Sequence, residues 1–228
     1  NVVADELFEA GADFLLTGEA EITAPELIKA VIRSEPIQEL SLLKGLILPG
    51  AKAIAMPVEV LTGREARVER KNRYIQNLDE LPLPAWDLFP LDNYWKLGFA
   101  HGPLSSKSYL PILTSRGCPY PCKFCVVPAT NEKTWRSRSP SNVVDEIEYW
   151  VNTLGVSEFH LEDLNPTIKD LRIREICAEI VERKLEVTWK IVAGTKVESI
   201  KDEQTIDLMA EAGCRYISIS PESGSAEV

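Results

Sequence analysis

The second half of the chain alternates between short apolar segments and longer amphipathic segments, and this alternation constrains the fold more than any other feature. The spacing predicts strands at 109–117, 157–163, 186–194 and 214–224, and helices at 139–155, 168–184 and 201–213. Strands joined by helical crossovers lie parallel in one sheet. We therefore expect an α/β fold, as part of a barrel or of a doubly wound sheet, with functional residues at the carboxyl ends of the strands.

The first of these helices has clear start signals. Ser139 is a typical N-cap residue, and Pro140 suits the first helical position. Val143, Ile147 and Trp150 then recur at helical spacing. The helix is expected to begin directly after Ser139 and to bury this apolar face.

The first half of the chain is less regular. Residues 1–33 have the pattern of helix, strand and helix, with Thr23 as a candidate cap for the second helix. Residues 34–75 resemble small strands and turns, including a hairpin near Thr62 and Gly63. Residues 76–110 combine prolines with many apolar side chains, which predicts an irregular connector that packs on a surface.

The charge balance argues against a protein that binds nucleic acid. Asp and Glu total 35 against 25 Lys and Arg, a formal charge of −10, and the chain has no long basic stripe. It also has neither an apolar run near the roughly 20 residues of a membrane span nor a signal peptide. We expect a cytoplasmic protein. Because the chain begins at Asn1 and stops after a strand-like run, we also expect a fragment of a longer protein.

Three of the five cysteines cluster in the sequence "RGCPYPCKFC" at 116–125, in the loop after the first predicted strand. Thiolates at this spacing suit soft metals or iron–sulfur clusters. A structural zinc site and a ferredoxin-type cluster both require four protein ligands. Cys177 and Cys214 are far away in regular elements, where they are expected to be buried as small hydrophobic residues. A cubane cluster with three cysteines and one open iron is the third alternative.

The loop itself suits a rigid binding site. Gly117 permits an unusual backbone conformation at the strand exit. Pro119 and Pro121 stiffen the loop and so reduce the entropy lost in fixing the thiols. Phe124, between the second and third thiols, is placed where an aromatic ring can cover a flat ligand.

The pattern Cys-x3-Cys-x2-Cys, with an aromatic residue before the last cysteine, resembles the signature of the radical S-adenosylmethionine (SAM) enzymes. The resemblance implies that Cys118, Cys122 and Cys125 bind a 4Fe–4S cluster. It also implies that the open iron binds the amino and carboxylate groups of SAM. An electron from the cluster then cleaves SAM to a 5′-deoxyadenosyl radical.

Segments after later strands resemble places where the family contacts SAM. In "LEDLNP", Glu162 and Asp163 are candidates for its amino group, although a capping loop with solvated acids is an alternative. In "PESGS", Glu222 and Ser223 are candidates for the methionine or ribose part, against a simple tight turn.

Further candidates lie outside those segments. Arg138 and Arg136 lie in a segment that resembles the lead into the family's first helix. Each is a candidate contact to SAM's carboxylate or to the cluster, and for each a place in a surface loop is the alternative. His160 is expected to be packed and hydrogen-bonded rather than catalytic. His101 could reach the mouth of the site.

The N-terminal segments "GADFLLTGEAEITAPELIKAV" and "LDELPLPAWDLFPLDNYW" are similar to parts of the cobalamin-dependent radical SAM enzymes. This resemblance divides the chain into a remnant of a Rossmann-like cobalamin-binding domain at 1–35, a connector at 36–107 and a truncated (β/α) radical SAM barrel at 108–228. The Asp-x-His-x-x-Gly motif that ligates cobalt in some cobalamin domains is missing from the sequence. Cobalamin is therefore expected in the full-length protein through family context alone.

The resemblance implies radical chemistry on a small molecule, with flavodoxin or ferredoxin as electron donor. Methylation with cobalamin as methyl carrier is expected, or an oxidative cyclisation or ring rearrangement. Two alternatives remain open: a non-catalytic zinc or iron–sulfur module, and a radical enzyme that modifies tRNA. The isolated fragment is expected to be inactive.

Overall fold

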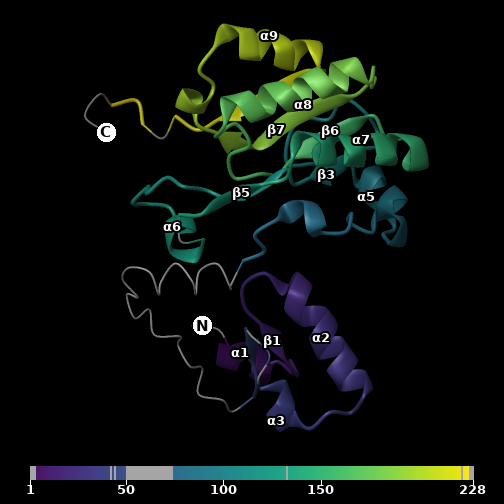
Figure 1. Cartoon of the computed structure of the whole chain (residues 1–228), viewed down its shortest axis with the longest axis vertical. Helices are drawn as coiled ribbons and strands as arrows, with labels where there is room; N and C mark the ends of the chain where they lie inside the picture. Colours follow the sequence, from purple (N-terminus) through teal and green to yellow (C-terminus); the bar gives the residue numbers. More distant parts are fainter. Residues whose placement is uncertain are drawn as a thin grey trace. The chain divides into compact units, whose positions relative to one another are not determined.

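The computed structural model describes residues 4–41, 43, 45–49, 74–131, 133–221 and 223–225. The chain forms two compact units, Asn1–Gln76 and Asn77–Val228, and each is described by itself. Figure 1 labels the elements of both units.

The first unit has the predicted order of helix, strand and helix, followed by a short helix and a second strand. β1 and β2 pair antiparallel, with Leu15 opposite Ile47. A small core of Leu27, Ala30 and Leu40 lies beneath them. The predicted hairpin near Thr62 lies outside the described residues. The elements are α1 (Ala4–Glu9), β1 (Leu15–Leu16), α2 (Ala20–Ile32), α3 (Ile37–Leu40) and β2 (Leu46–Ile47).

The prediction of Thr23 as a helix cap is wrong. Helix α2 begins at Ala20, so Thr23 lies inside its first turn. Its N-cap residue is Glu19, whose side chain does not cap the helix. The Glu19 carboxylate instead accepts a hydrogen bond of 2.7 Å from the backbone N–H of Ile75. A contact across the unit thus replaces the local cap.

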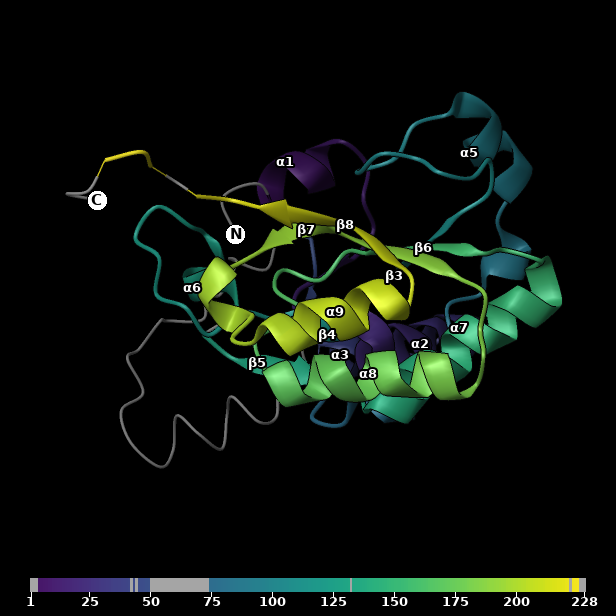
Figure 2. The same ribbon diagram turned by 90° about the horizontal axis from the view of Figure 1, so that it is seen from above.

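The second unit contains the predicted parallel sheet. Its strands are β3 (Leu110–Ile112), β6 (Glu158–Leu161), β7 (Thr188–Thr195) and β8 (Cys214–Ile219), paired in that order and all parallel. The crossover helices are α7 (Pro140–Leu154), α8 (Asp170–Glu182) and α9 (Glu203–Glu211). Figure 2 shows all three helices on one face of the sheet, and α8 packs against both of its neighbours. The alternation in the sequence therefore predicted this architecture correctly.

The main core lies between the sheet and these helices. Phe159, Trp189 and Ile191 on the strands and Ile147 and Ile176 on the helices are at most 4% exposed. Helix α7 begins as predicted, since Ser139 Oγ accepts a 3.2 Å hydrogen bond from the Asn142 N–H.

The predicted strand 109–117 divides into two. After β3 the chain leaves the sheet and enters β4 (Ser115–Gly117), which pairs antiparallel with β5 (Trp135–Ser137). The break falls at Thr114, whose N–H donates to the carboxylate of Asp163 rather than to a neighbouring strand. The side chain of Asp163, which follows β6, thus ends β3.

The connector packs on the second unit, as predicted, but it is more regular than expected. Two 3-10 turns, η1 (Leu78–Glu80) and η2 (Trp86–Leu88), precede the short helix α5 (Leu91–Leu97), which ends at Gly98. Trp86, Leu91 and Trp95 pack against the main core. Each proline falls outside these elements, so the prolines delimit short elements instead of preventing them. Across the described residues, no helix is long and apolar enough to cross a membrane.

Candidate functional site

The three clustered cysteines lie at the carboxyl end of the parallel sheet, in the loop that joins β4 to β5. All are free thiols with intermediate exposure. The Cys125 N–H donates to the Cys122 carbonyl at 3.2 Å. The Cys125 sulfur in turn accepts a 3.4 Å hydrogen bond from the Val127 N–H, at the start of the short helix α6 (Val127–Thr130). This loop is called the cysteine loop below.

Gly117 has the special conformation that its place in the sequence predicted. Its φ is +84°, in the left-handed region that favours glycine. A Cβ there would lie 1.9 Å from the carbonyl oxygen of Thr134, on the opposite side of the hairpin. Only glycine lets the hairpin close at the entry to the cysteine loop.

The thiols influence one another electrostatically. Burial raises the pKa of Cys118, and the neighbouring Cys122 and Cys125 raise it further. A hydrogen bond from the Tyr120 backbone and the charge of Lys196 oppose this rise. Among the described residues, however, no three Cys, His, Asp or Glu side chains converge closely enough to hold a single metal ion. The thiols are neighbours without forming a closed site for one ion.

Cys177 and Cys214 are the buried small residues that the sequence predicted. Burial raises the pKa of Cys177 to about 12 and that of Cys214 to about 11, so both stay protonated at neutral pH. Cys214 is the first residue of β8 and therefore lies at the amino end of its strand, whereas the cysteine loop follows the carboxyl end of β3.

The structure separates the two acids that follow β6. Asp163 is fully buried. It accepts hydrogen bonds from the Thr114 N–H at 2.9 Å, from the Thr114 hydroxyl at 2.8 Å and from the Ser115 hydroxyl. Burial raises its pKa, while these donors and Arg172 oppose the rise. The carboxylate is thus taken up by the β3–β4 junction, so Asp163 is the less accessible of the two acids that were predicted to contact SAM.

Glu162 is the acid that stays accessible. Its side chain is 30% exposed and lies 2.8 Å from His101 Nδ1. It also lines a pocket of about 340 Å³, together with connector residues such as Leu81 and Trp86. His101 is thus the partner of Glu162, and its own side chain is exposed.

Arg138 has a structural role that its position in the sequence did not reveal. Its guanidinium donates to the Leu113 carbonyl at 3.1 Å, to the side chain and carbonyl of Asn142 at 2.6 and 2.9 Å, and to the buried Glu146. Its own carbonyl accepts a 2.8 Å hydrogen bond from Arg172. These contacts fasten the exit of β3 to α7, and Arg138 also lines the pocket beside Glu162, so its role toward SAM stays a prediction.

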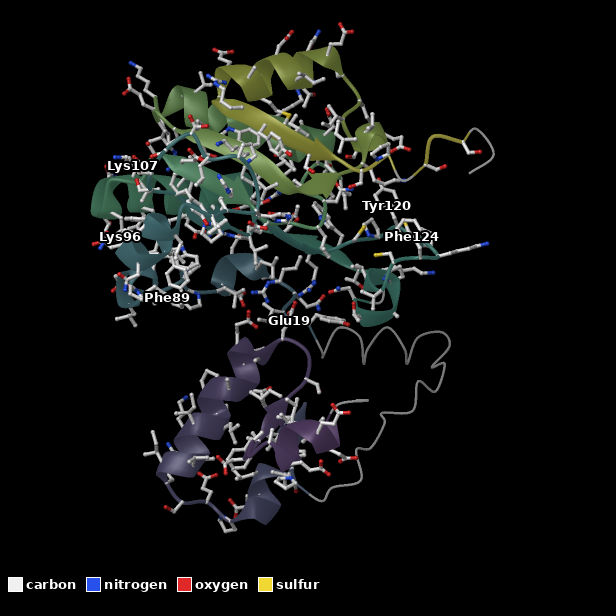
Figure 3. The ribbon with its side chains drawn as sticks, turned by 180° about the vertical axis from the view of Figure 1, so that it is seen from behind. Glu19, Phe89, Lys96, Lys107, Tyr120 and Phe124 are labelled. Atoms are coloured by element: carbon white, nitrogen blue, oxygen red, sulfur yellow. The ribbon has the colours of Figure 1, made fainter. Side chains whose placement is uncertain are left out.

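Phe124 and Ser223 are exposed, whereas Arg136 on β5 is buried. Phe124 is 72% exposed on the cysteine loop. Figure 3 labels it close to Tyr120, with sulfur atoms beside them. Ser223 lies in an exposed turn after β8, where its hydroxyl accepts a 3.0 Å hydrogen bond from the Ser225 N–H. Glu222 lies outside the described residues.

His160 is packed and hydrogen-bonded, as the sequence predicted. It is fully buried, stacks on Tyr109 at 4.6 Å between ring centroids, and pairs with Glu158 at 2.8 Å. Lys190 also donates to Glu158 at 2.8 Å. Burial alone would raise the pKa of Glu158, but hydrogen bonds from Lys190 and His160 outweigh it and the pKa is lowered.

Lys196 is a residue that the sequence did not point to. It follows the last residue of β7, and its ammonium lies 4.4 Å from the ring centroid of Tyr120 in the cysteine loop. No local motif could have revealed it, because its partner is distant in the sequence.

The fold is a four-stranded parallel sheet with helical crossovers, and a loop with three free thiols follows the carboxyl end of its first strand. The family model of the radical SAM superfamily matches residues 112–228, which is more than half of the chain. The chain belongs to the radical SAM superfamily, which confirms the family that the cysteine spacing indicated.

Similarity to known proteins extends across the N-terminal residues as well. An uncharacterized methyltransferase, PH0819, of Pyrococcus horikoshii is 29% identical over 216 residues, 95% of this chain and 41% of the relative. The anaerobic magnesium-protoporphyrin IX monomethyl ester cyclase of Rubrivivax gelatinosus is 30% identical over 219 residues, 93% of this chain and 35% of the relative. The chain thus spans about two fifths or less of these relatives.

A solved structure has the same fold. TsrM of Kitasatospora setae, a radical S-adenosylmethionine methyltransferase, was solved with tryptophan substrate and a SAM analogue. It is 22% identical to this chain, with a TM-score of 0.71 over 98% of this chain and 40% of TsrM. A second TsrM structure, with cobalamin and a [4Fe–4S] cluster, gives a TM-score of 0.66.

Proposed function

We propose that the intact protein is a radical SAM enzyme in which Cys118, Cys122 and Cys125 bind a 4Fe–4S cluster with one open iron. The observation that carries the proposal is a loop with three thiols at the carboxyl end of a parallel sheet, while the other two thiols are buried elsewhere. When bound, the cluster would supply the electron that cleaves SAM to a 5′-deoxyadenosyl radical.

The arrangement of the thiols favours this cluster over a zinc site. Ligands of one tetrahedral zinc at about 2.3 Å must lie within about 4 Å of each other. A closed zinc site also requires a fourth protein ligand. A cubane with one open iron requires only three thiols, and the other two cysteines are buried in the core.

The protein's own residues would bind and orient SAM around the open iron. Glu162 is the acid proposed to accept a hydrogen bond from SAM's amino group, because its carboxylate is partly exposed and aligned by His101. Phe124 is proposed to cover the ligand. Glu222 and Ser223 are proposed to contact its methionine or ribose part. Asp163 and Arg138 would hold the surrounding backbone in place.

The chemistry of the relatives supports a substrate of low molecular weight. The relatives are named as methyltransferases or as a porphyrin-ester cyclase, and a TsrM structure contains cobalamin. We therefore propose a cobalamin-dependent methylation, or a related radical reaction, on a small molecule, with flavodoxin or ferredoxin as the electron donor. Five free cysteines fit a reducing compartment, so the cytoplasm is the proposed location.

Iron and acid-labile sulfide, measured after anaerobic reconstitution, test the proposal. We expect close to four irons and four sulfides per chain, with loss of the brown chromophore in Cys118→Ala, Cys122→Ala and Cys125→Ala. Cys177→Ala and Cys214→Ala are the controls and should keep the cluster, since both thiols are buried in the core. Zinc without sulfide, or loss of the cluster in Cys214→Ala, would contradict the open-iron site.

A further inference from the structure

Lys196 is a cation that the end of β7 presents to the cysteine loop. It comes directly after Thr195, the last residue of that strand. Its ammonium lies 4.4 Å from the centroid of the Tyr120 ring, within the range of a cation–π contact. Tyr120 itself lies between Cys118 and Cys122. The contact therefore connects the third strand of the sheet to the loop of the proposed cluster.

Buried hydroxyl groups fix the backbone beneath Lys196. The Thr195 hydroxyl donates to the Asn165 side chain at 2.7 Å, and the Ser199 hydroxyl donates to the Lys196 carbonyl at 2.6 Å. The Thr167 hydroxyl is hydrogen-bonded to both Thr195 and Ser199. These four polar residues are at most 5% exposed. Because its base is rigid, the Lys196 side chain has a defined starting direction toward Tyr120.

The ammonium favours negative charge at the cysteines. Because the Lys196 ammonium contacts Tyr120, which lies between Cys118 and Cys122 in the loop, its positive charge acts on these sulfurs. The competing anion is weak, since Glu198 is 3.9 Å from Lys196 and its side chain is 74% exposed. A nearby cation would likewise favour the reduced state of a cluster, which carries one more negative charge than the oxidised state. Net charge around the sulfurs is among the factors that set cluster potentials.

We propose that Lys196 is a positioning residue for the iron–sulfur site: it holds the cysteine loop through Tyr120 and raises the reduction potential of the cluster. This inference rests on the proposed function, since it takes the cluster to be bound by the loop. The electron itself comes from an external one-electron donor.

Potentiometric titration of the reconstituted intact protein, followed by electron paramagnetic resonance without SAM, tests the effect on potential. In Lys196→Met the ratio of reduced to oxidised cluster at a fixed potential should fall about three- to tenfold. This fall is a shift of about 30 to 60 mV to more negative potential. Lys196→Arg should keep the wild-type potential, because arginine keeps the charge and also stacks on aromatic rings.

Lys169→Met is the matched control. Lys169 lies over Trp135, 5.5 Å from the ring centroid, and Trp135 is on β5 of the same hairpin but outside the cysteine loop. Its removal should leave the potential unchanged. A Lys196→Met cluster with the wild-type potential, or an equal shift in Lys169→Met, would overturn the proposed electrostatic role.

Trypsin cleavage after Lys123 tests the positioning role without a cluster. Lys123 is exposed inside the cysteine loop, so its cleavage in the apoprotein reports opening of the loop. We expect Lys196→Met and Tyr120→Leu to be cut several-fold faster than the wild type and Lys169→Met to be cut at the wild-type rate. Equal rates in all variants would refute the clamp. If the wild type bound no cluster, the proposed function would fail, whereas this measurement would still decide whether Lys196 holds the loop.

Discussion

Neighbouring acids at the end of β6 have different environments, and this difference decides what each can do. Asp163 is buried and accepts hydrogen bonds from Thr114 and Ser115, whereas Glu162 is partly exposed beside His101. The sequence offered both as contacts to SAM. Only the surroundings distinguish an accessible carboxylate from one that the protein's own groups occupy.

This difference predicts opposite effects of two conservative substitutions in the intact protein. Glu162→Gln should weaken SAM binding about tenfold, the loss of one charged hydrogen bond of about 1.5–3 kcal/mol, and should leave the melting temperature unchanged. Asp163→Asn should lower the free energy of unfolding by about 1–3 kcal/mol, because an amide cannot accept all of the hydrogen bonds. Calorimetric titration with SAM and thermal unfolding separate the two. Unchanged SAM affinity in Glu162→Gln would remove this residue from the binding site.

At the scale of elements, the β4–β5 hairpin is what presents the cysteines. It depends on Asp163 and Arg138, which fasten the exit of β3, and on Gly117, where the Thr134 carbonyl leaves no room for a Cβ. The hairpin is therefore a rigid mount for the loop, although the loop itself is partly exposed.

We expect Gly117→Ala to disrupt this mount. The substitution places a methyl group 1.9 Å from the Thr134 oxygen and adds the left-handed backbone cost of about 1–2 kcal/mol. The variant should unfold at a lower temperature and retain less iron after reconstitution. Gly155→Ala is the control, since Gly155 has φ +65° but no atom within 4 Å of a Cβ. Gly155→Ala should be destabilised only by the cost of the left-handed backbone and should keep the cluster. Equal losses in both variants would show that the close approach at Gly117 is unimportant.

At the scale of the whole second unit, the connector forms part of the fold and does not merely link domains. The Ser105 N–H donates to Glu158 at 2.9 Å, and Lys190 donates to the Ser105 hydroxyl at 2.7 Å and to the Pro103 carbonyl. Lys190 and Glu158 are almost fully buried side chains on β7 and β6. A buried ion pair therefore fastens the connector to the face of the sheet opposite the helices.

Lys190→Met should leave the Glu158 charge buried without its main partner and destabilise the unit by about 3–5 kcal/mol. The double variant Lys190→Met with Glu158→Gln should recover much of this loss, because no charge is then left unpaired. The pH dependence follows from the lowered pKa of Glu158. The stabilisation is present above the ordinary pKa of 4.5 and is lost as the pH falls through the lower pKa of the folded state. Chemical denaturation between pH 3 and 7 measures both effects. A double variant as unstable as Lys190→Met, or as acid-sensitive as the wild type, would contradict this account.

The order of strands and helices, the start of α7 at Ser139, the unusual backbone of Gly117 and the grouping of three thiols could be predicted from the amino-acid pattern alone. These features depend on residues that are near one another in the chain, so local patterns and steric preferences are sufficient to predict them. The contacts that occupy Asp163 and Arg138, the accessibility of Glu162 and the contact of Lys196 with Tyr120 could be seen only in the folded chain. The reason is physical: a parallel sheet brings the carboxyl ends of distant strands together, and the partners that meet there have no fixed spacing in the sequence.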